Sequence, residues 1–280
     1  MKGSPGINNR LFLMIAYTGA IFLLLFTTLL TLQKRQSKMI HFESDEQFHR
    51  EISSIINLNS KGQRQMVFDY TYWDEFNEIM SKGGNSTWFD QNISTILTSY
   101  DYDYVAVYSV ANQLLYERSS EDYRLSEVIP EGALELLDKK RLLNFFIETT
   151  EGYMEIASAS IHPTFDQNRT QTEPSGYIFI GKLWDEKMVQ YLSNFTSSQI
   201  TIGKGMLYDD HKDYILHSHI IFPGYEGTNI GGAHFLRENP VFKLYYSSSV
   251  YMMAVLLLSL AFIWITIRYA TRLWVIKPLK

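Results

Sequence analysis

Two long runs of uncharged, mostly apolar residues limit what this chain can fold into. Neither Leu11–Leu32 nor Leu244–Ile267 contains a charged residue. At about 1.5 Å per helical residue, each run is long enough to cross the ~30 Å hydrocarbon core of a membrane. A cleaved signal peptide is the other interpretation of the first run. It fits less well, because the run exceeds an apolar signal core and the polar segment Gln33–Gln36 stands where a cleavage site would be. The sequence therefore predicts membrane helices at 11–32 and 244–267.

The charges outside these runs predict the orientation of the chain. The ends, 1–10 and 268–280, hold basic residues and no acidic one, so we expect both in the cytoplasm. The segment 33–243 carries 19 of the 25 basic residues and all 30 acidic ones, a formal charge of −11 that suits a location outside the cytoplasm. Lys34, Arg35 and Lys38, just after the first run, argue against this orientation of the first helix. The distribution of charges around the second run favours it clearly and requires the same topology. We predict a multi-pass protein of the plasma or inner membrane.

Composition and motifs exclude several classes of function. The chain has no cysteine, which rules out a disulfide scaffold, and an acidic exported domain would repel nucleic acid. No nucleophile elbow, phosphate loop or metalloprotease helix is present, so we expect no catalytic site and no cofactor. His217 and His219 would share one face of a strand, with Asp209, Asp210, His211 and Asp213 just upstream. Nothing in the sequence makes these groups converge, and we predict no metal site.

The exported segment begins with helical periodicity. Apolar residues recur at helical spacing through 33–59, so the first membrane helix is expected to continue outward. Gly62 marks an expected break, and a second helix is expected over 63–80, ended by Gly83. The stripe formed by Ile52, Ile55, Ile56 and Asn59 is either a dimer seam or the face that packs on the domain.

After a short helix near 88–99, strand patterns dominate the remaining segment. The apolar and turn patterns predict two hairpins, at 104–120 and 144–161, then a strand at 176–184 and another at 198–203. Helices are expected from Pro130 to about 143, and from the N-cap Asp185 to about 195. Neighbouring strands after a long helix predict an α+β domain with an antiparallel, PAS-like sheet.

Three blocks of the sequence resemble the fourth class of CHASE domains, the extracellular sensory modules of bacterial receptors. They are "DYTYWDEF" from Asp69, "DYVAVYSVANQLLY" from Asp103, and "GYIFIGKLWDEKMVQYLSNFTSSQITI" from Gly176. The family usually has an arginine, an apolar residue and an aspartate in the third block, where this chain has Lys182-Leu-Trp-Asp185. The tail "VIKPLK" resembles the start of a HAMP linker, and any output domain, such as a histidine kinase or diguanylate cyclase, is expected outside this chain.

The first of these blocks raises the question of an acid among aromatic residues. On a helix over 63–80, Asp69 falls in the middle of the apolar arc. A buried carboxylate needs a partner. Either Asp69 pins the helix to a loop or an arginine, or it binds a ligand in a pocket walled by Tyr70, Tyr72 and Trp73.

A second aromatic stretch could edge the same kind of pocket. Tyr100, Tyr102 and Tyr104 alternate with Asp101 and Asp103, either at the edge of a pocket or at an ordinary strand entry. The candidate ligand-binding residues are Asp69, Tyr70, Tyr72, Trp73 and Tyr104.

The resemblance implies a sensor that binds a small-molecule ligand and acts as a homodimer in the membrane. A ligand-induced shift in the domain would move both membrane helices and so reach the output domain. A membrane-anchored binding or assembly protein without signalling output is the alternative, and an enzyme outside the cytoplasm is a third reading that lacks a catalytic constellation.

Overall fold

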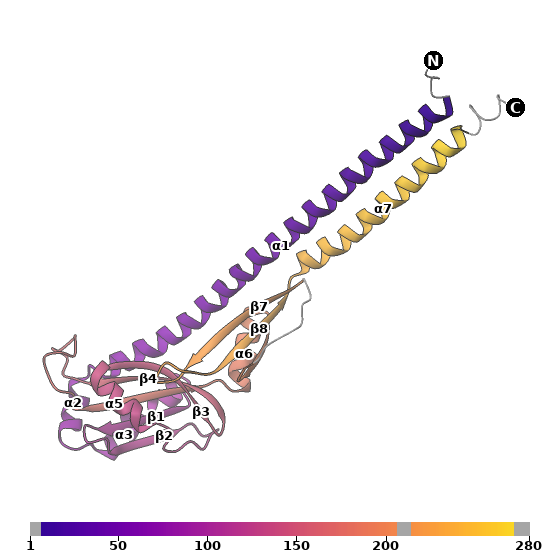
Figure 1. Cartoon of the computed structure of the whole chain (residues 1–280). Coiled ribbons are helices and arrows are strands. Elements are labelled where there is room, and N and C mark those ends of the chain that lie inside the picture. The colour runs from indigo at the N-terminus through magenta and orange to yellow at the C-terminus, as the bar shows by residue number, and fades with distance from the viewer. Residues whose placement is uncertain (1–6, 206–213, 272–280) are drawn as a thin grey trace. The chain divides into compact units, whose positions relative to one another are not determined.

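The computed structural model describes residues 7–205 and 214–271 (Figure 1). The chain divides into two compact units. The central unit comprises Gln47–Asp210 and His217–Arg237, and the terminal unit comprises the two ends of the chain with His211–Leu216. Residues 1–6 and 272–280 of the predicted tails 1–10 and 268–280, and the acidic stretch 206–213, lie outside the described residues.

Helix α1 runs without interruption over Ile7–Tyr70 (Figure 1). The expected break at Gly62 is wrong: the residue is exposed in mid-helix, where a glycine costs about 1 kcal/mol relative to alanine without ending the helix. In the central unit one face of α1 is buried, at Phe48, Ile52, Ile56 and Val67. The stripe considered as a dimer seam therefore packs on the domain through Ile52 and Ile56.

The expected helix over 63–80 is two helices. Helix α1 ends at Tyr70, and α2 (Asp74–Ser81) begins after Trp73, whose backbone is extended. At the break the Thr71 hydroxyl donates to the carbonyls of Val67 (2.8 Å) and Phe68 (2.9 Å). Such back-bonding competes with the main-chain hydrogen bonds that would continue a helix.

Two further short helices replace the expected helix near 88–99. They are α3 (Ser86–Asn92), which begins at the N-cap Asn85, and α4 (Thr95–Ser99). Phe76 of α2 packs against Trp88 and Phe89 of α3, and the three ring centroids are 5.4–6.2 Å apart. Together with α1 and α2, these helices cover one face of the main sheet.

The main sheet has five antiparallel strands in the order β2-β1-β5-β4-β3. Its strands are β1 (Tyr104–Ser109), β2 (Leu114–Ser119), β3 (Leu142–Thr149), β4 (Gly152–Ile161) and β5 (Gly176–Leu183). Both predicted hairpins are confirmed, as β1–β2 and β3–β4. Successive residues of β1 point to opposite faces of the sheet, and both faces are buried. Val105 and Val107 lie on the face covered by α1, while Tyr104 and Ala106 lie in the core beneath α5 (Glu131–Lys140).

A smaller sheet follows, with strand order β6-β8-β7. It consists of β6 (Gln199–Gly203), β7 (Ile215–Pro223) and β8 (Asn229–Glu238), and α6 (Glu186–Thr196) precedes it. The predicted N-cap of α6 is confirmed, because an Asp185 carboxylate oxygen accepts a 2.7 Å hydrogen bond from Met188 N–H. The α+β domain with an antiparallel main sheet is confirmed, whereas the second sheet was not predicted.

The terminal unit ends in helix α7 (Pro240–Thr271). Two helices of the described chain are long and apolar enough to cross a membrane, Ala16–Tyr70 of α1 and Val250–Tyr269 of α7. The boundaries predicted for the spans, 11–32 and 244–267, stay predictions.

Candidate ligand-binding site

Asp69 does not lie where helical periodicity placed it. Its side chain is exposed and accepts a 2.9 Å hydrogen bond from Gln65 Nε2, one turn earlier. The expectation of a buried Asp69 is wrong because the chain breaks at Thr71, so Trp73, Phe76 and Met80 belong to a different helix and do not share its helical phase. The buried face of α1 here is defined by Gln63 and Val67 instead.

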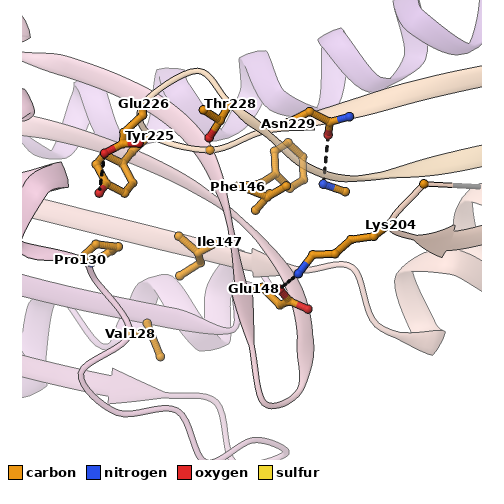
Figure 2. Close-up of a pocket in the computed structure, with 14 residues that line it drawn as sticks. Val128, Pro130, Phe146, Ile147, Glu148, Lys204, Tyr225, Glu226, Thr228 and Asn229 are labelled. Carbon is orange, nitrogen blue, oxygen red and sulfur yellow. Dashed lines mark hydrogen bonds and ion pairs between the residues drawn. The ribbon is translucent and has the colours of Figure 1, made fainter.

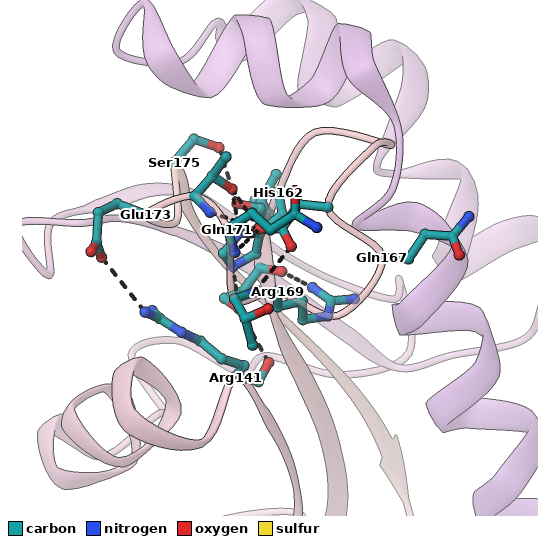
Figure 3. A network of polar contacts seen from close by, with 12 residues as sticks. Arg141, His162, Gln167, Arg169, Gln171, Glu173 and Ser175 are labelled. Carbon is teal, nitrogen blue, oxygen red and sulfur yellow. Dashed lines mark hydrogen bonds and ion pairs between the residues drawn. The ribbon is translucent and has the colours of Figure 1, made fainter.

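The aromatic residues of this motif hold an arginine from a distant loop. Arg169 is 3% exposed, and its guanidinium lies over the rings of Phe68 (5.0 Å) and Tyr72 (4.6 Å). It donates to Thr71 Oγ1 (2.7 Å) and to the Ser160 carbonyl (Figure 3). The polar and cationic contacts around the end of α1 are therefore a structural joint between that helix and the β4–β5 loop.

The same loop is organised by a second, fully buried acid. The Asp166 carboxylate accepts from the N–H groups of Thr170, Gln171 and Thr172 (2.9–3.0 Å) and from the Thr172 hydroxyl (2.8 Å). Burial raises the pKa of Asp166, but these hydrogen bonds outweigh it and hold the pKa well below its usual range. The pinning role considered for Asp69 thus belongs to Asp166 and Arg169.

Beside Asp166, His162 bridges two hydroxyl groups (Figure 3). Its ring nitrogens lie 2.9 Å from Ser160 Oγ and 3.0 Å from Thr172 Oγ1. Burial and the charge of Arg169 lower the pKa of His162, which favours the neutral ring. The loop is therefore held by a neutral histidine, an ionised aspartate and a stacked arginine.

The other predicted site residues lie apart from one another. Trp73 packs on Trp88 with ring centroids 4.9 Å apart, and Tyr70 lies edge-on to Tyr100 at 6.4 Å. Tyr104 is fully buried on the opposite face of the sheet, where its hydroxyl donates to Glu117 Oε1 (2.6 Å). The structure therefore does not gather the five candidates around one cavity, and their ligand-binding roles stay a prediction.

A cavity of about 360 Å³ lies between α1, the entry to β1, the end of β5 and α6. We call it the α1 cavity. Its lining residues are Asn59, Gln63, Leu97, Tyr100, Asp101, Tyr102, Asp103, Ser120, Asp122, Tyr123, Lys182, Asp185, Lys187, Met188 and Tyr191. The alternating Tyr and Asp residues considered as a pocket edge line it as far as Asp103. Both ends of the Lys182-to-Asp185 block line it as well.

Lys182 is the central cation of the α1 cavity. Its ammonium donates to the Asp101 carbonyl (2.5 Å) and lies 3.1 Å from the Asp101 carboxylate and 3.3 Å from Asp103 Oδ2. Asp103, 8% exposed, also accepts a 2.8 Å hydrogen bond from Leu183 N–H. Burial raises the pKa of Asp103 even though Lys182 and Leu183 oppose that shift. The site therefore holds a carboxylate whose negative charge is costly.

The remaining charges of the cavity are also paired. Lys187 lies 2.6 Å from Asp122, and the Tyr123 hydroxyl donates to Asp185, the N-cap of α6. Burial and the hydrogen bond to Asp185 raise the pKa of Tyr123, and burial raises the pKa of Tyr102 to about 12. Both tyrosines are therefore neutral hydrogen-bonding groups at physiological pH.

Gln63, a lining residue of the α1 cavity, links α1 to the main sheet. This side chain is 3% exposed, and its Nε2 donates to the carbonyls of Glu155 on β4 (3.1 Å) and Ile180 on β5 (2.9 Å). Sequence reasoning missed Gln63 and Tyr123, since neither stands in a motif. A polar residue on the apolar face of α1 was the available signal for Gln63.

A larger cavity, of about 610 Å³, lies between β3 and the β7–β8 turn (Figure 2). Lys204 pairs with Glu148 across it, and the Asn229 side chain accepts a 3.0 Å hydrogen bond from Gly231 N–H. Its lining includes no residue of α1. A ligand there would lack the direct contact with α1 that the α1 cavity provides.

The histidines noted in the sequence meet a third one on β8. His217 Nδ1 lies 3.4 Å from His234 Nε2, and the rings of His219 and His234 are 6.2 Å apart. Burial and the two neighbouring histidines lower the pKa of His234. Within 7–205 and 214–271, no group of three or more His, Cys, Asp or Glu side chains is arranged to hold a metal ion.

Solved structures similar to this chain include the periplasmic domain of Vibrio cholerae LuxQ, at 11% identity and a TM-score of 0.46, covering 70% of this chain and 100% of that one. The ligand-binding domain of the Campylobacter jejuni chemoreceptor Tlp3, in complex with L-valine, is similar at 8% identity and a TM-score of 0.41, covering 75% and 97%. No curated protein matches.

The assignment to a family depends on a domain match. Residues 55–203, just over half of the chain, match the CHASE4 domain. The match runs from Ile55 in α1 to the end of β6 and so includes the main sheet and every lining residue of the α1 cavity. The chain belongs to the CHASE4 domain family of extracellular sensory domains.

Proposed function

We propose that this chain is the sensory region of a two-span membrane receptor. The central unit, outside the cytoplasm, binds a small-molecule ligand, and α1 and α7 carry the resulting shift to a cytoplasmic output module such as a histidine kinase. The continuity of α1 is the observation that gives the sensory role its strongest support. One unbroken helix contains the first apolar run and, at Asn59 and Gln63, a wall of the α1 cavity.

Gln63 gives this wall a mechanical connection. Its hydrogen bonds to β4 and β5 hold α1 against the sheet at the cavity. A ligand that changes the distance between α1 and the opposite side of the α1 cavity would displace α1. Because α1 is one continuous helix, the displacement would be transmitted along its axis. The ligand must bind one arrangement better than the other, by about 1.4 kcal/mol for each tenfold shift in the equilibrium.

The membrane topology is testable because the natural chain lacks cysteine. Single cysteines replace exposed Glu226 in the central unit, or Lys2 or Lys277 at the ends. On intact cells, a membrane-impermeant maleimide is expected to label the Glu226→Cys variant alone, and all three after lysis. Labelling of either end on intact cells, with Glu226→Cys protected, would reverse the proposed orientation.

Signal transmission is tested by the distance between the two helices. Spin labels are attached to cysteines replacing exposed Lys38 on α1 and Ser248 on α7 in the full chain, reconstituted in lipid. Compounds that raise the thermal unfolding midpoint are then added one at a time. A receptor is expected to change its distance distribution with such a compound. Saturable binding that leaves the distribution unchanged would instead support an anchored binding or assembly protein without signalling output.

A homodimer in the membrane is part of the same proposal. Because Ile52 and Ile56 are buried within the chain, the partner would have to contact other faces of α1, where Met39 and Phe42 are exposed. Disulfide cross-linking of a Phe42→Cys variant in membranes tests the homodimer. A cross-linked dimer is expected, and a monomer at all expression levels would contradict the proposed dimer.

A further inference from the structure

The walls of the α1 cavity carry more negative than positive charge, and its cations are already paired. Its lining includes four carboxylates and two ammonium groups. Lys182 is held by Asp101 and Asp103, and Lys187 is paired with Asp122. An anionic ligand would therefore meet no unpaired cation among the lining residues, and it would have to approach the buried carboxylate of Asp103.

The buried member of this set favours an added cation. Asp103 is almost fully buried, and the carboxylate of Asp185 adds to its electrostatic cost. One ammonium, that of Lys182, lies between Asp101 and Asp103. A second positive charge in the cavity would lower the cost of the ionised Asp103, because opposite charges within a few ångströms stabilise each other most where water is largely excluded.

The uncharged walls also suit an organic cation. Tyr100, Tyr102, Tyr123 and Tyr191 line the cavity, and the negative face of a tyrosine ring attracts an ammonium group. The buried hydroxyl oxygen of Ser120 has no hydrogen-bond partner among the residues that the structure describes. A small movement of the wall would open that oxygen to the cavity, where it could accept from an ammonium N–H. The volume, about 360 Å³, lies within the range of small-molecule pockets.

We propose that the α1 cavity binds a small organic amine in its protonated form, with the ammonium between Asp103, Asp101 and Ser120 and the carbon skeleton against the tyrosine rings. This proposal names the ligand class for the proposed sensor and rests on that function. In this arrangement Lys182 competes with the ligand for the same carboxylates.

The experiment uses three four-carbon probes of similar size and different charge: 1,4-diaminobutane, 1,4-butanediol and succinate. Binding to the full chain in detergent is measured by calorimetry at pH 7 and low salt. The diamine is expected to bind saturably, and the diol and succinate at least about tenfold more weakly, as expected when charge-assisted contacts are missing. Saturable binding of succinate or of the diol as tight as that of the diamine overturns the amine assignment, and so does absence of diamine binding.

Two variants with opposite expected effects place the diamine in this cavity. Asp103→Asn is expected to weaken diamine binding about tenfold, since it removes the charged acceptor of the ammonium hydrogen bond. Lys182→Met removes the ammonium that competes with the ligand and is expected to tighten diamine binding at least threefold. Glu148→Gln, in the larger cavity of Figure 2, is the matched control and is expected to leave the affinity unchanged.

The variants remain informative when one of them fails to fold, because Lys182→Met predicts a gain that misfolding does not produce. Diamine binding that responds to Glu148→Gln and not to the two cavity variants overturns the site. The spin-label distances separate this proposal from the sensor function. A compound of another charge class that binds and changes the Lys38–Ser248 distance refutes the amine and leaves the sensor standing.

Discussion

The contact of α1 with the sheet depends on one amide side chain. In Gln63→Met, a side chain of similar length loses both hydrogen bonds to the carbonyls of Glu155 and Ile180. A typical hydrogen bond contributes about 0.5–1.5 kcal/mol net, so the expected loss is about 2 kcal/mol. At roughly 2–4 °C per kcal/mol for a domain of this size, thermal unfolding followed by circular dichroism should shift down by roughly 4–8 °C.

Gln65→Met is the matched control for this prediction. Gln65 lies on the exposed side of the same helix and donates to exposed Asp69. Surface substitutions of this kind usually change stability by less than about 0.5 kcal/mol, so its midpoint should stay within roughly 2 °C of the natural protein. Equal shifts in the two variants, or an unchanged midpoint in Gln63→Met, would refute the view that Gln63 holds α1 on the sheet.

Three further predictions follow from buried polar groups. Tyr104→Phe removes the hydroxyl that donates to Glu117, and a drop in unfolding free energy of about 1–2 kcal/mol is expected in urea titrations; no change would contradict that bond. Burial raises the pKa of Glu155 above its usual 4.5, so folding favours the protonated acid and its contribution is lost as pH rises above about 4.5. The unfolding midpoint of the natural protein should therefore fall relative to that of Glu155→Gln between pH 4 and pH 7. A difference between the two midpoints that does not change with pH would refute the raised pKa of Glu155. Arg169→Lys loses the planar stacking on Tyr72, so amide hydrogen exchange in the β4–β5 loop should speed up. Arg118→Lys, which changes an exposed arginine that pairs with Asp90, should leave that rate unchanged.

Local patterns were sufficient for much of the architecture. The hairpins β1–β2 and β3–β4 follow from alternation and short turns, and Asp185 was identifiable as an N-cap because a side-chain oxygen satisfies the N–H groups of the helix that directly follows. Each of these features depends on residues close in the sequence. The strands β7 and β8 were not assigned, since their pattern is mixed with polar and histidine residues.

The environment of the aromatic motif required contacts between distant residues. Periodicity placed Asp69 on the buried side on the assumption that one helix runs over 63–80. That helix stops at the point where Thr71 accepts a hydrogen bond from Arg169, 98 positions later in the chain. Similarly, the ion pairs of Lys182 with Asp101 and Asp103 join segments about 80 residues apart.

By itself, the sequence determined the two apolar helices, the acidic domain between them and its antiparallel strands, because these depend on local composition and on period. Only the tertiary structure decided which acids are buried, which arginine the aromatic residues hold, and where α1 contributes a wall to a cavity. Burial and charge pairing depend on which distant segments meet, and a helical or strand period carries no information about that choice.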